Sequence, residues 1–83
     1  MPYTVTASPT ALDELALIWT MASDRDAVSR ASNKIDAILK SAPLGQGIDL
    51  GDYRTLTIEP LTVCYTVSPD DCLVTIRRYI YRG

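Results

Sequence analysis

The period of the hydrophobic pattern changes once along this chain, and that change limits the folds open to it. From Pro9 to about Ala42, apolar residues recur every three or four positions, which is the spacing of amphipathic helices. From Tyr53 to Tyr81 they alternate with polar residues, as in strands that bury one face. A chain of 83 residues suffices for one domain. The pattern therefore predicts a single α+β domain over residues 1–83, with helices grouped beside an antiparallel sheet.

The first helix is expected to run from Pro9 to about Ala22. Ser8 can cap it, and proline fits the first helical position because no hydrogen-bond donor is needed there. A capping box of Thr10 and Asp13 is the alternative start. Because the sequence lacks Phe, its single Trp and its five Tyr are expected to fill the core together with aliphatic residues. The expected core-facing stripe of this helix consists of Leu12, Leu15, Ala16 and Trp19.

The second helix is expected to begin at a capping box of Ser23 and Asp26 and to reach about Ser41. Pro43 stops it. Because the link between the helices is short, we expect an antiparallel helix hairpin. The expected stripe of the second helix consists of Val28, Ala31, Ile35, Ile38 and Ala42.

Four strands complete the prediction, one before the helices and three after them. The three later strands form a meander, because short turn signals separate them. The predicted order is thus β-α-α-β-β-β, with the helix hairpin packed on one face of the antiparallel sheet. The expected strands are Tyr3–Ala7, Tyr53–Ile58, Leu61–Val67 and Leu73–Tyr81, with turns at Glu59-Pro60 and Ser68–Asp71.

Two cysteines flank the last turn. If the hairpin is symmetric about Ser68–Asp71, Val67 faces Cys72 and Cys64 faces Thr75. The cysteines then do not face each other, and a disulfide would require distortion. We expect two free thiols in a reducing cytoplasm. The first residues lack the basic and apolar regions of a signal peptide, and no apolar run is long enough to span a membrane.

Composition excludes several kinds of site. The sequence has no His and two Cys, so neither a zinc site nor an imidazole base is expected. The net charge of -2 argues against nucleic-acid binding driven by total charge. The chain contains no nucleophile elbow, phosphate loop or Cys-x-x-Cys pair. We expect no metal and no cofactor.

Cations and tyrosines on the meander are the remaining candidates for function. The planar fork of arginine suits anion recognition, and a tyrosine ring can stack on a base. The alternative is that these residues are solvated strand ends and half-buried sheet residues. The candidate target- or partner-binding residues are Arg54, Arg77, Arg78, Tyr79, Tyr81 and Arg82.

Arg78 is unusual among these candidates. It shares the strand phase of Val74 and Ile76, and it should therefore point toward the apolar face unless a bulge intervenes. There it would pair with an acidic residue or line a groove.

The meander resembles the C-terminal half of the RelE/ParE superfamily, the toxins of bacterial type II toxin–antitoxin pairs. The segment Tyr53–Val67 contains the series Arg-x-Leu-x-Ile-x-Pro followed by Val-x-Tyr-x-Val. After an acidic turn, Val74 begins Val-Thr-Ile-Arg-Arg. The opening Tyr-x-Val, the Ser-Pro helix start and the helix hairpin fit the same plan, so the resemblance covers nearly the whole chain. It implies helices packed against a curved antiparallel sheet.

The resemblance implies a growth-inhibiting toxin that a cognate antitoxin wraps and holds inactive. ParE-like members inhibit DNA gyrase, whereas RelE-like members cleave mRNA at the ribosome. Arg54 and Arg82 match basic positions of the cleaving members. The arginine that those members carry on the middle strand falls at or beside Thr62 here, and their His is missing. Arg77 followed by Arg78 is more similar to the ParE branch.

We therefore expect a ParE-like inhibitor that binds a cellular target such as DNA gyrase. One alternative is a metal-independent endoribonuclease acting on mRNA at the ribosome, in which Arg54 and Arg82 are catalytic and stabilise developing charge. The other is a superfamily member without toxicity that serves as a partner-binding domain. A homodimer is compatible with the sequence, which does not fix the oligomeric state.

Overall fold

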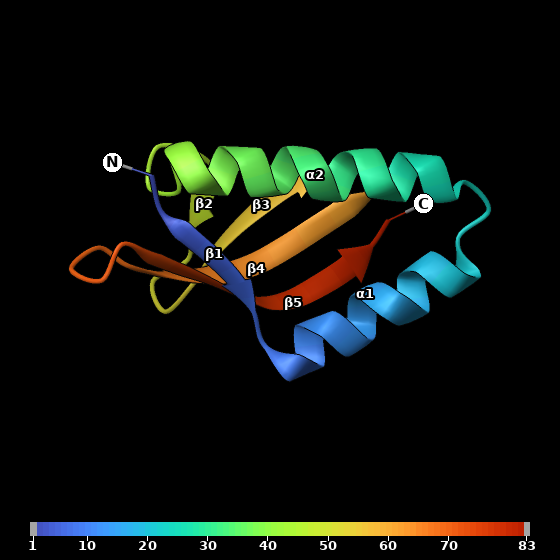
Figure 1. Ribbon diagram of the computed structural model, residues 1–83, viewed down its shortest axis with the longest axis horizontal. Helices are drawn as coiled ribbons and strands as arrows, with labels where there is room; N and C mark the ends of the chain where they lie inside the picture. Colours follow the sequence, from blue (N-terminus) through green and yellow to red (C-terminus); the bar gives the residue numbers. More distant parts are fainter. Residues whose placement is uncertain (1, 83) are drawn as a thin grey trace.

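The computed structural model describes residues 2–82 and places two helices on a five-stranded sheet (Figure 1). The α+β class and the order of the predicted elements are confirmed. An additional two-residue strand, β2, lies in the loop after the second helix, where the sequence pattern gives no strand signal. The elements are β1 (Thr4–Ala7), α1 (Pro9–Met21), α2 (Arg25–Ser41), β2 (Ile48–Asp49), β3 (Arg54–Ile58), β4 (Leu61–Ser68) and β5 (Leu73–Tyr81).

The strand order in the sheet is β1-β5-β4-β3-β2. The meander strands pair antiparallel, whereas β1 pairs parallel with β5 because both helices lie between them in the chain. Ala7 at the end of β1 pairs with Ile76. Within residues 2–82, no strand pairs with the outer edge of β5 beyond Ile76. That edge becomes important for the candidate site.

Helix α2 buries the stripe that its sequence predicts, with one shift near its end. Val28, Ala31 and Ile35 are buried as expected. Leu39 is fully buried in place of Ile38, which packs at the edge of the core, while Ala42 is half-buried. The 3.6-residue period favours Leu39 because it continues the row from Ile35 four residues earlier.

The expected stripe of α1 is wrong. Ala11 and Ile18 are its buried residues, whereas Leu12 and Trp19 remain 55% and 47% exposed. Leu15 is half-buried at the edge of the core. Because α1 carries apolar side chains on several sides, several stripes fit the helical period and the pattern alone does not select the buried one. Trp19 is therefore not a core residue, and the buried tyrosines Tyr65 and Tyr79 are the large aromatic side chains of the core.

The two helices run in opposite directions, as expected, but they diverge from the turn that joins them (Figure 1). Helix α1 packs mainly on β5, and α2 packs on β3, β1 and β4. The helices thus contact the sheet more than each other. The hairpin is open, and a groove lies between its arms.

The helix starts are decided by hydrogen bonds of their capping residues. Ser8 caps α1, as predicted, and its Oγ accepts a hydrogen bond from the Ala11 N–H at 3.2 Å. Helix α2 is capped by Asp24 and not by the expected Ser23: Asp24 Oδ1 accepts from the Ala27 N–H at 3.0 Å. Asp24 stands three residues before that N–H, which is the spacing that a cap requires.

The register of the last hairpin differs from the symmetric one expected. Ser68 pairs with Leu73 and Val67 with Val74, so the turn includes Cys72. Cys72 takes a left-handed backbone conformation with φ 49°, which lengthens the turn. Cys64 pairs with Arg78, and both cysteines are free thiols. The prediction that they do not face each other is confirmed.

The loop between α2 and β3 is tied to the core by a buried phenol. Tyr65 is fully buried, and its OH donates to the carbonyl oxygens of Pro43 at 2.8 Å and of Gln46 at 3.2 Å. Gly47 has φ 76°, and a Cβ there would collide with the Thr55 carbonyl. The backbone therefore passes closely over β3 and Tyr65, and this fixes the residues that precede Arg54.

Candidate functional site

A β-bulge decides where the adjacent arginines of β5 point. Tyr65 pairs with Ile76, whereas the preceding Cys64 pairs with Arg78, so Arg77 is an extra residue in β5. The bulge that would turn Arg78 away from the apolar face is therefore present, and Arg78 pairs with an acidic residue, Glu14, and lines a groove, as expected. Arg77 and Arg78 are both exposed. After the bulge, Tyr79 takes the buried phase instead, at 6% exposure.

Arg77 and Arg78 line a groove of about 520 Å³ on the sheet, which we call the arginine groove. Aromatic, thiol and hydroxyl groups of the neighbouring strands and loop complete its walls. The full lining is Asp52, Tyr53, Cys64, Thr66, Arg77, Arg78 and Ile80. Two adjacent guanidinium groups with an exposed tyrosine make this groove suited to an anionic group attached to a flat or apolar one.

Each groove arginine is held by its Nε. Arg77 Nε donates to Thr66 Oγ1 at 3.3 Å, and Arg78 Nε donates to Glu14 Oε2 of α1 at 2.7 Å. The second distance is that of a charge-assisted hydrogen bond. Across residues 2–82, no acceptor binds the terminal nitrogens of either guanidinium. Each guanidinium group is thus held through its Nε, while its two terminal nitrogens can still donate hydrogen bonds to a ligand.

Arg54 lies apart from this pair and is largely engaged. Its side chain is 18% exposed and forms an ion pair with Asp49 at 3.4 Å. Nη2 donates to the carbonyl oxygens of Leu44 and Gln46, both at 3.2 Å. These bonds tie β2 and its preceding loop to the start of β3. A catalytic role for Arg54 stays a prediction, and its observed contacts are those of a structural arginine.

The last candidates divide between the core and the surface. Tyr79 is buried, and burial raises the pKa of its phenol, Asp36 raises it further and a hydrogen bond with Ser32 lowers it. Tyr81 is half-buried against the core. Arg82 is exposed, and its backbone N–H donates to the Pro60 carbonyl at 2.7 Å. Of the predicted residues, the arginine groove therefore brings together Arg77 and Arg78, and their roles stay predictions.

Cys64 adds a protonated thiol to the arginine groove. Burial raises the pKa of this thiol; Arg78 lowers it and Glu14 raises it. Because the thiolate is the reactive form, this position does not favour a cysteine nucleophile.

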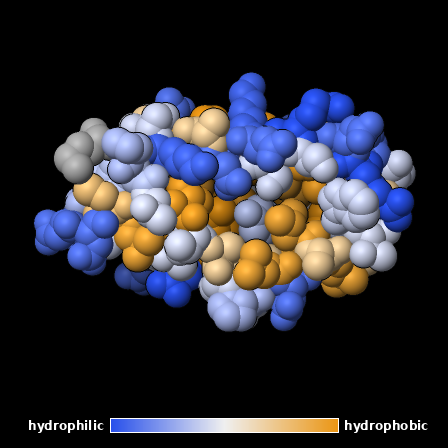
Figure 2. All heavy atoms as spheres, in the orientation of Figure 1, coloured by the Kyte–Doolittle hydropathy of each residue, from blue (hydrophilic) through white to orange (hydrophobic). Residues whose placement is uncertain are grey.

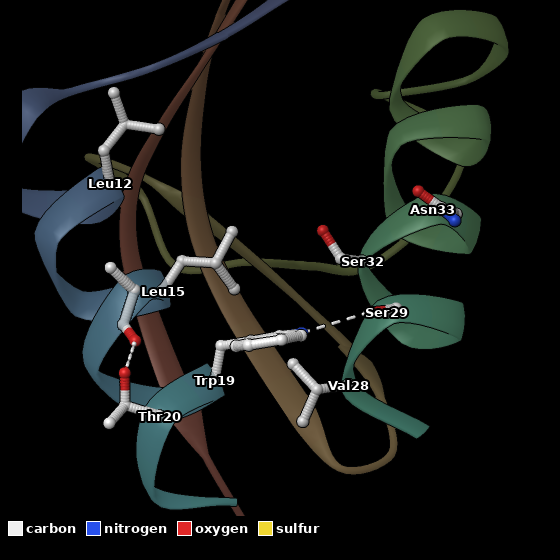
Figure 3. Close-up of a pocket in the computed structure, with 9 residues that line it drawn as sticks. Leu12, Leu15, Trp19, Thr20, Val28, Ser29, Ser32 and Asn33 are labelled. Carbon is white, nitrogen blue, oxygen red and sulfur yellow. Dashed lines mark hydrogen bonds between the residues drawn. The ribbon is translucent and has the colours of Figure 1, made fainter. Parts of the chain in front are cut away.

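A second concave surface, the helix groove, lies between the diverging arms of the hairpin and has a volume of about 580 Å³. Figure 2 shows apolar side chains gathered there, between α2 and α1. The α1 wall is apolar except for Thr20, and the α2 wall carries hydroxyl and amide groups beside Val28 (Figure 3). The lining is Leu12, Leu15, Ala16, Trp19 and Thr20 from α1, and Val28, Ser29, Ser32 and Asn33 from α2.

Trp19 is fixed in the helix groove although it is exposed. Its Nε1–H donates to Ser29 Oγ at 3.3 Å, across the groove (Figure 3). The guanidinium of Arg25 lies over the indole ring, 5.0 Å from its centre. Arg25 is itself held, because its Nε donates to the Trp19 carbonyl at 2.9 Å and its Nη2 to the Thr20 carbonyl at 3.2 Å. The ring is thus a pre-oriented aromatic anchor.

Solved structures similar to this chain come from toxin–antitoxin systems. A chain of the toxin–antitoxin complex RelBE2 from Mycobacterium tuberculosis matches with a TM-score of 0.83 and 20% identity, covering 99% of this chain and 93% of that one. A chain of the chromosomal ParDE system from P. aeruginosa matches with a TM-score of 0.71 and 16% identity, covering 98% and 97%. The chain has the RelE/ParE fold. The isolated RelE toxin of E. coli matches with a TM-score of 0.71 and 15% identity, covering 98% and 85%.

The RelE/ParE fold implied by the sequence resemblance is therefore confirmed. No protein-family model matches the chain, and a search of the curated proteins finds no match. No helix among residues 2–82 is long and apolar enough to cross a membrane. Across the same residues, no group of three or more metal-ligating side chains is placed to hold an ion.

Two residues of this RelE/ParE-fold chain matter more than its sequence indicated. The first is Glu14, which forms the ion pair with Arg78. Its signal was an acidic residue outside the predicted α1 stripe, together with an arginine in an apolar strand phase that needed an acidic partner. Ser29 fixes Trp19, but a serine on the polar side of an amphipathic helix gives no such signal.

Proposed function

We propose that this chain is the toxin of a toxin–antitoxin pair, that it inhibits growth by binding a cellular target such as DNA gyrase, and that an antitoxin protein keeps it inactive. The helix groove carries the proposal, because a folded domain of this size gains nothing by itself from leaving Leu12 and Trp19 exposed. Related folds crystallised as toxin–antitoxin complexes support the assignment of the partner.

An amphipathic helix of the antitoxin is the proposed occupant of the helix groove. Its apolar face would lie on Leu12, Leu15 and Trp19, as in other helix-in-groove complexes. Its polar edge would meet the hydroxyl and amide groups of α2. Arg25 at the Trp19 end forms no ion pair with another described residue and would attract an acidic side chain of the partner.

Inhibition by binding is favoured over RNA cleavage by the state of the candidate catalytic positions. Arg54 is bound to Asp49 and to backbone carbonyls. Thr62, at or beside the position where the resemblance places an arginine of cleaving members, is buried, and its Oγ1 shares a hydrogen bond with Thr57 Oγ1 at 2.8 Å. The sequence also has no His to move a proton near neutral pH.

The arginine groove favours a second candidate, the endoribonuclease. Arg77 and Arg78 could bind a phosphate while Tyr53, 41% exposed, stacks on a base. In such a reaction the RNA 2′-oxygen bonds to the adjacent phosphorus, the bond to the 5′-oxygen breaks, and the 2′-proton leaves as the 5′-oxygen gains one. Arg82, a candidate catalytic residue together with Arg54, does not line this groove.

Induced expression separates these functions. The proposal predicts growth arrest with filamentation, loss of DNA supercoiling by purified gyrase when the chain is added, and recovery when the protein from a neighbouring small reading frame is co-expressed. Arrest with cut mRNA and active gyrase would instead establish the ribonuclease. Normal growth would establish a partner-binding domain without toxicity and refute the toxin assignment.

A further inference from the structure

The start of α1 takes the place of a strand along the outer edge of β5. β1 ends at Ala7, where the chain turns into the helix. The Ser8 N–H donates to the Ile76 carbonyl at 2.9 Å, and Ser8 Oγ donates to the Arg77 carbonyl at 3.3 Å. Six residues further along, Glu14 Oε1 accepts from the Tyr79 N–H at 3.2 Å. The backbone and side chain of the capping residue Ser8, and the side chain of Glu14, therefore satisfy backbone groups that a strand would otherwise pair.

Glu14 forms hydrogen bonds with both residues that follow the bulge, Arg78 and Tyr79. One carboxylate oxygen holds the backbone of Tyr79, and the other accepts from Arg78 Nε at 2.7 Å. A carboxylate fixed at both oxygens has little freedom to turn, so it fixes the plane of the guanidinium that it binds. The Glu14 side chain is 24% exposed and that of Arg78 is 57% exposed, which leaves the end of the guanidinium in the arginine groove.

We infer that Glu14 is a positioning residue for the arginine groove: it orients Arg78 so that both terminal nitrogens face a carboxylate of the protein target. This inference rests on the proposed function, since it names how the inhibitor meets its target. An arginine side chain loses conformational entropy when it binds a target. The hydrogen bond with Glu14 already restricts Arg78 in the free chain, so much of this entropy cost is removed from the binding step. Because Glu14 binds Arg78 through Nε, the two terminal nitrogens of the guanidinium remain free to bind a carboxylate together.

The test compares Glu14→Gln with Asp13→Asn. Both changes remove one negative charge from α1, but Asp13 is exposed and makes no described hydrogen bond or ion pair. We expect Glu14→Gln to raise the concentration that half-inhibits gyrase supercoiling by roughly three- to tenfold, the effect of restoring freedom to one side chain. Asp13→Asn should leave it unchanged. Arg78→Gln should lower inhibition at least as much as Glu14→Gln.

A spectroscopic readout separates positioning from folding. In the wild-type chain and in Asp13→Asn, the Nε–H proton of Arg78 should exchange slowly with water and give a shifted NMR signal. In Glu14→Gln that signal should move and exchange faster, while the thermal unfolding midpoint defines any loss of fold. The exchanged pair, Glu14→Arg with Arg78→Glu, should stay folded and lose inhibition, because an acid then occupies the groove.

Three results would overturn the inference. Equal inhibition by Glu14→Gln and Asp13→Asn would show that the contact between Glu14 and Arg78 does not contribute to target binding. Full inhibition by the exchanged pair would show that the ion pair is purely structural. An unchanged Arg78 Nε–H signal in Glu14→Gln would show that Glu14 does not orient the guanidinium. A wild-type chain without any growth effect would instead refute the proposed function, and with it the target-binding role assigned to Arg78.

Discussion

The two helices of this protein use their apolar residues differently. Helix α2 buries a single stripe that includes Ile35 and Leu39, and most of its other positions are polar. Helix α1 buries Ala11 and Ile18 but leaves large apolar side chains in solvent. The exposed ones are Leu12, Leu17, Trp19 and Met21, at 55%, 60%, 47% and 71%.

Under the proposed function, this difference separates residues that build the fold from residues that would meet the antitoxin. A helix that is apolar on every side is expected to be buried on more than one side. Helix α1 is covered on one side by β5, and its side toward the helix groove is open. Helix α2 therefore mainly stabilises the domain, whereas α1 also leaves an apolar side exposed, which the proposed function assigns to the antitoxin. The following predictions test that division, from the largest expected effect to the smallest.

Truncation of a buried α2 residue should cost far more stability than truncation of an exposed α1 residue. Ile35→Ala removes a fully buried side chain and should lower the free energy of unfolding by about 3 to 4 kcal/mol. Leu12→Ala should lower it by less than about 1 kcal/mol. Urea titration measures both values. Similar losses in the two variants would break the proposed division between the helices.

Trp19→Ala should weaken partner binding strongly while leaving the fold intact. A pre-oriented aromatic anchor contributes about 2 kcal/mol or more, so the dissociation constant for the antitoxin should rise at least about 30-fold. Met21→Ala is the matched control, because Met21 is more exposed but lies outside the helix groove. Calorimetry measures both constants. Greater loss from Met21→Ala would move the interface to the other flank of α1.

Arg25→Ala should have a smaller effect on the same interaction. It removes the cation from the Trp19 ring and two hydrogen bonds at the end of α1, so the anchor becomes mobile before binding. We expect a two- to fivefold rise in the dissociation constant, from about 0.5 to 1 kcal/mol of cation–π energy. In a double variant with Trp19→Ala the Arg25 effect should fall to the part that comes from its attraction for an acidic side chain of the partner. A full, additive effect there would show that Arg25 acts entirely through its own contact with the partner.

The partly buried carboxyl of Asp36 on α2 is expected to oppose folding slightly when it is ionised. Burial raises the pKa of its carboxyl, and Lys40 lowers it. A raised pKa in the folded state means that the stabilising contribution is present at low pH and is lost as the pH rises through that pKa. Asp36→Asn should therefore stabilise the chain at pH 7 by less than about 0.5 kcal/mol, since solvent screens the partly exposed carboxyl. At pH 3 the urea midpoints should coincide; a gain that persists there would have another cause.

The change of period sufficed to predict the fold class and the order of the main elements. Helix α2 was predictable to within one residue of its stripe, because polar residues such as Arg30 and Lys34 leave a single choice of buried face. The buried stripe of helix α1 was not predictable, because apolar residues on several of its sides give the period little contrast. Its buried face is selected by packing against β5. Because β5 lies far from α1 in the sequence, the local pattern of α1 does not contain this information.

Of the six candidate residues, the structure brings Arg77 and Arg78 together in the arginine groove, and the sequence pattern predicts neither this grouping nor its geometry. Alternation placed Arg78 toward the core, and only the bulge at Arg77 reverses it. The bulge depends on how β4 and β5 pair across a turn that Cys72 lengthens. The contact between Glu14 and Arg78 joins residues 64 positions apart, which no local pattern encodes.

The chain has a single tryptophan, and it lies in the helix groove, so its fluorescence tests the central claim directly. The measurement is acrylamide quenching of Trp19 in the free chain and in complex with an antitoxin that contains no tryptophan. The account predicts efficient quenching in the free chain, where Trp19 is 47% exposed, and strong protection in the complex. A stable complex in which Trp19 is quenched as efficiently as before would contradict it, because the antitoxin would then bind elsewhere.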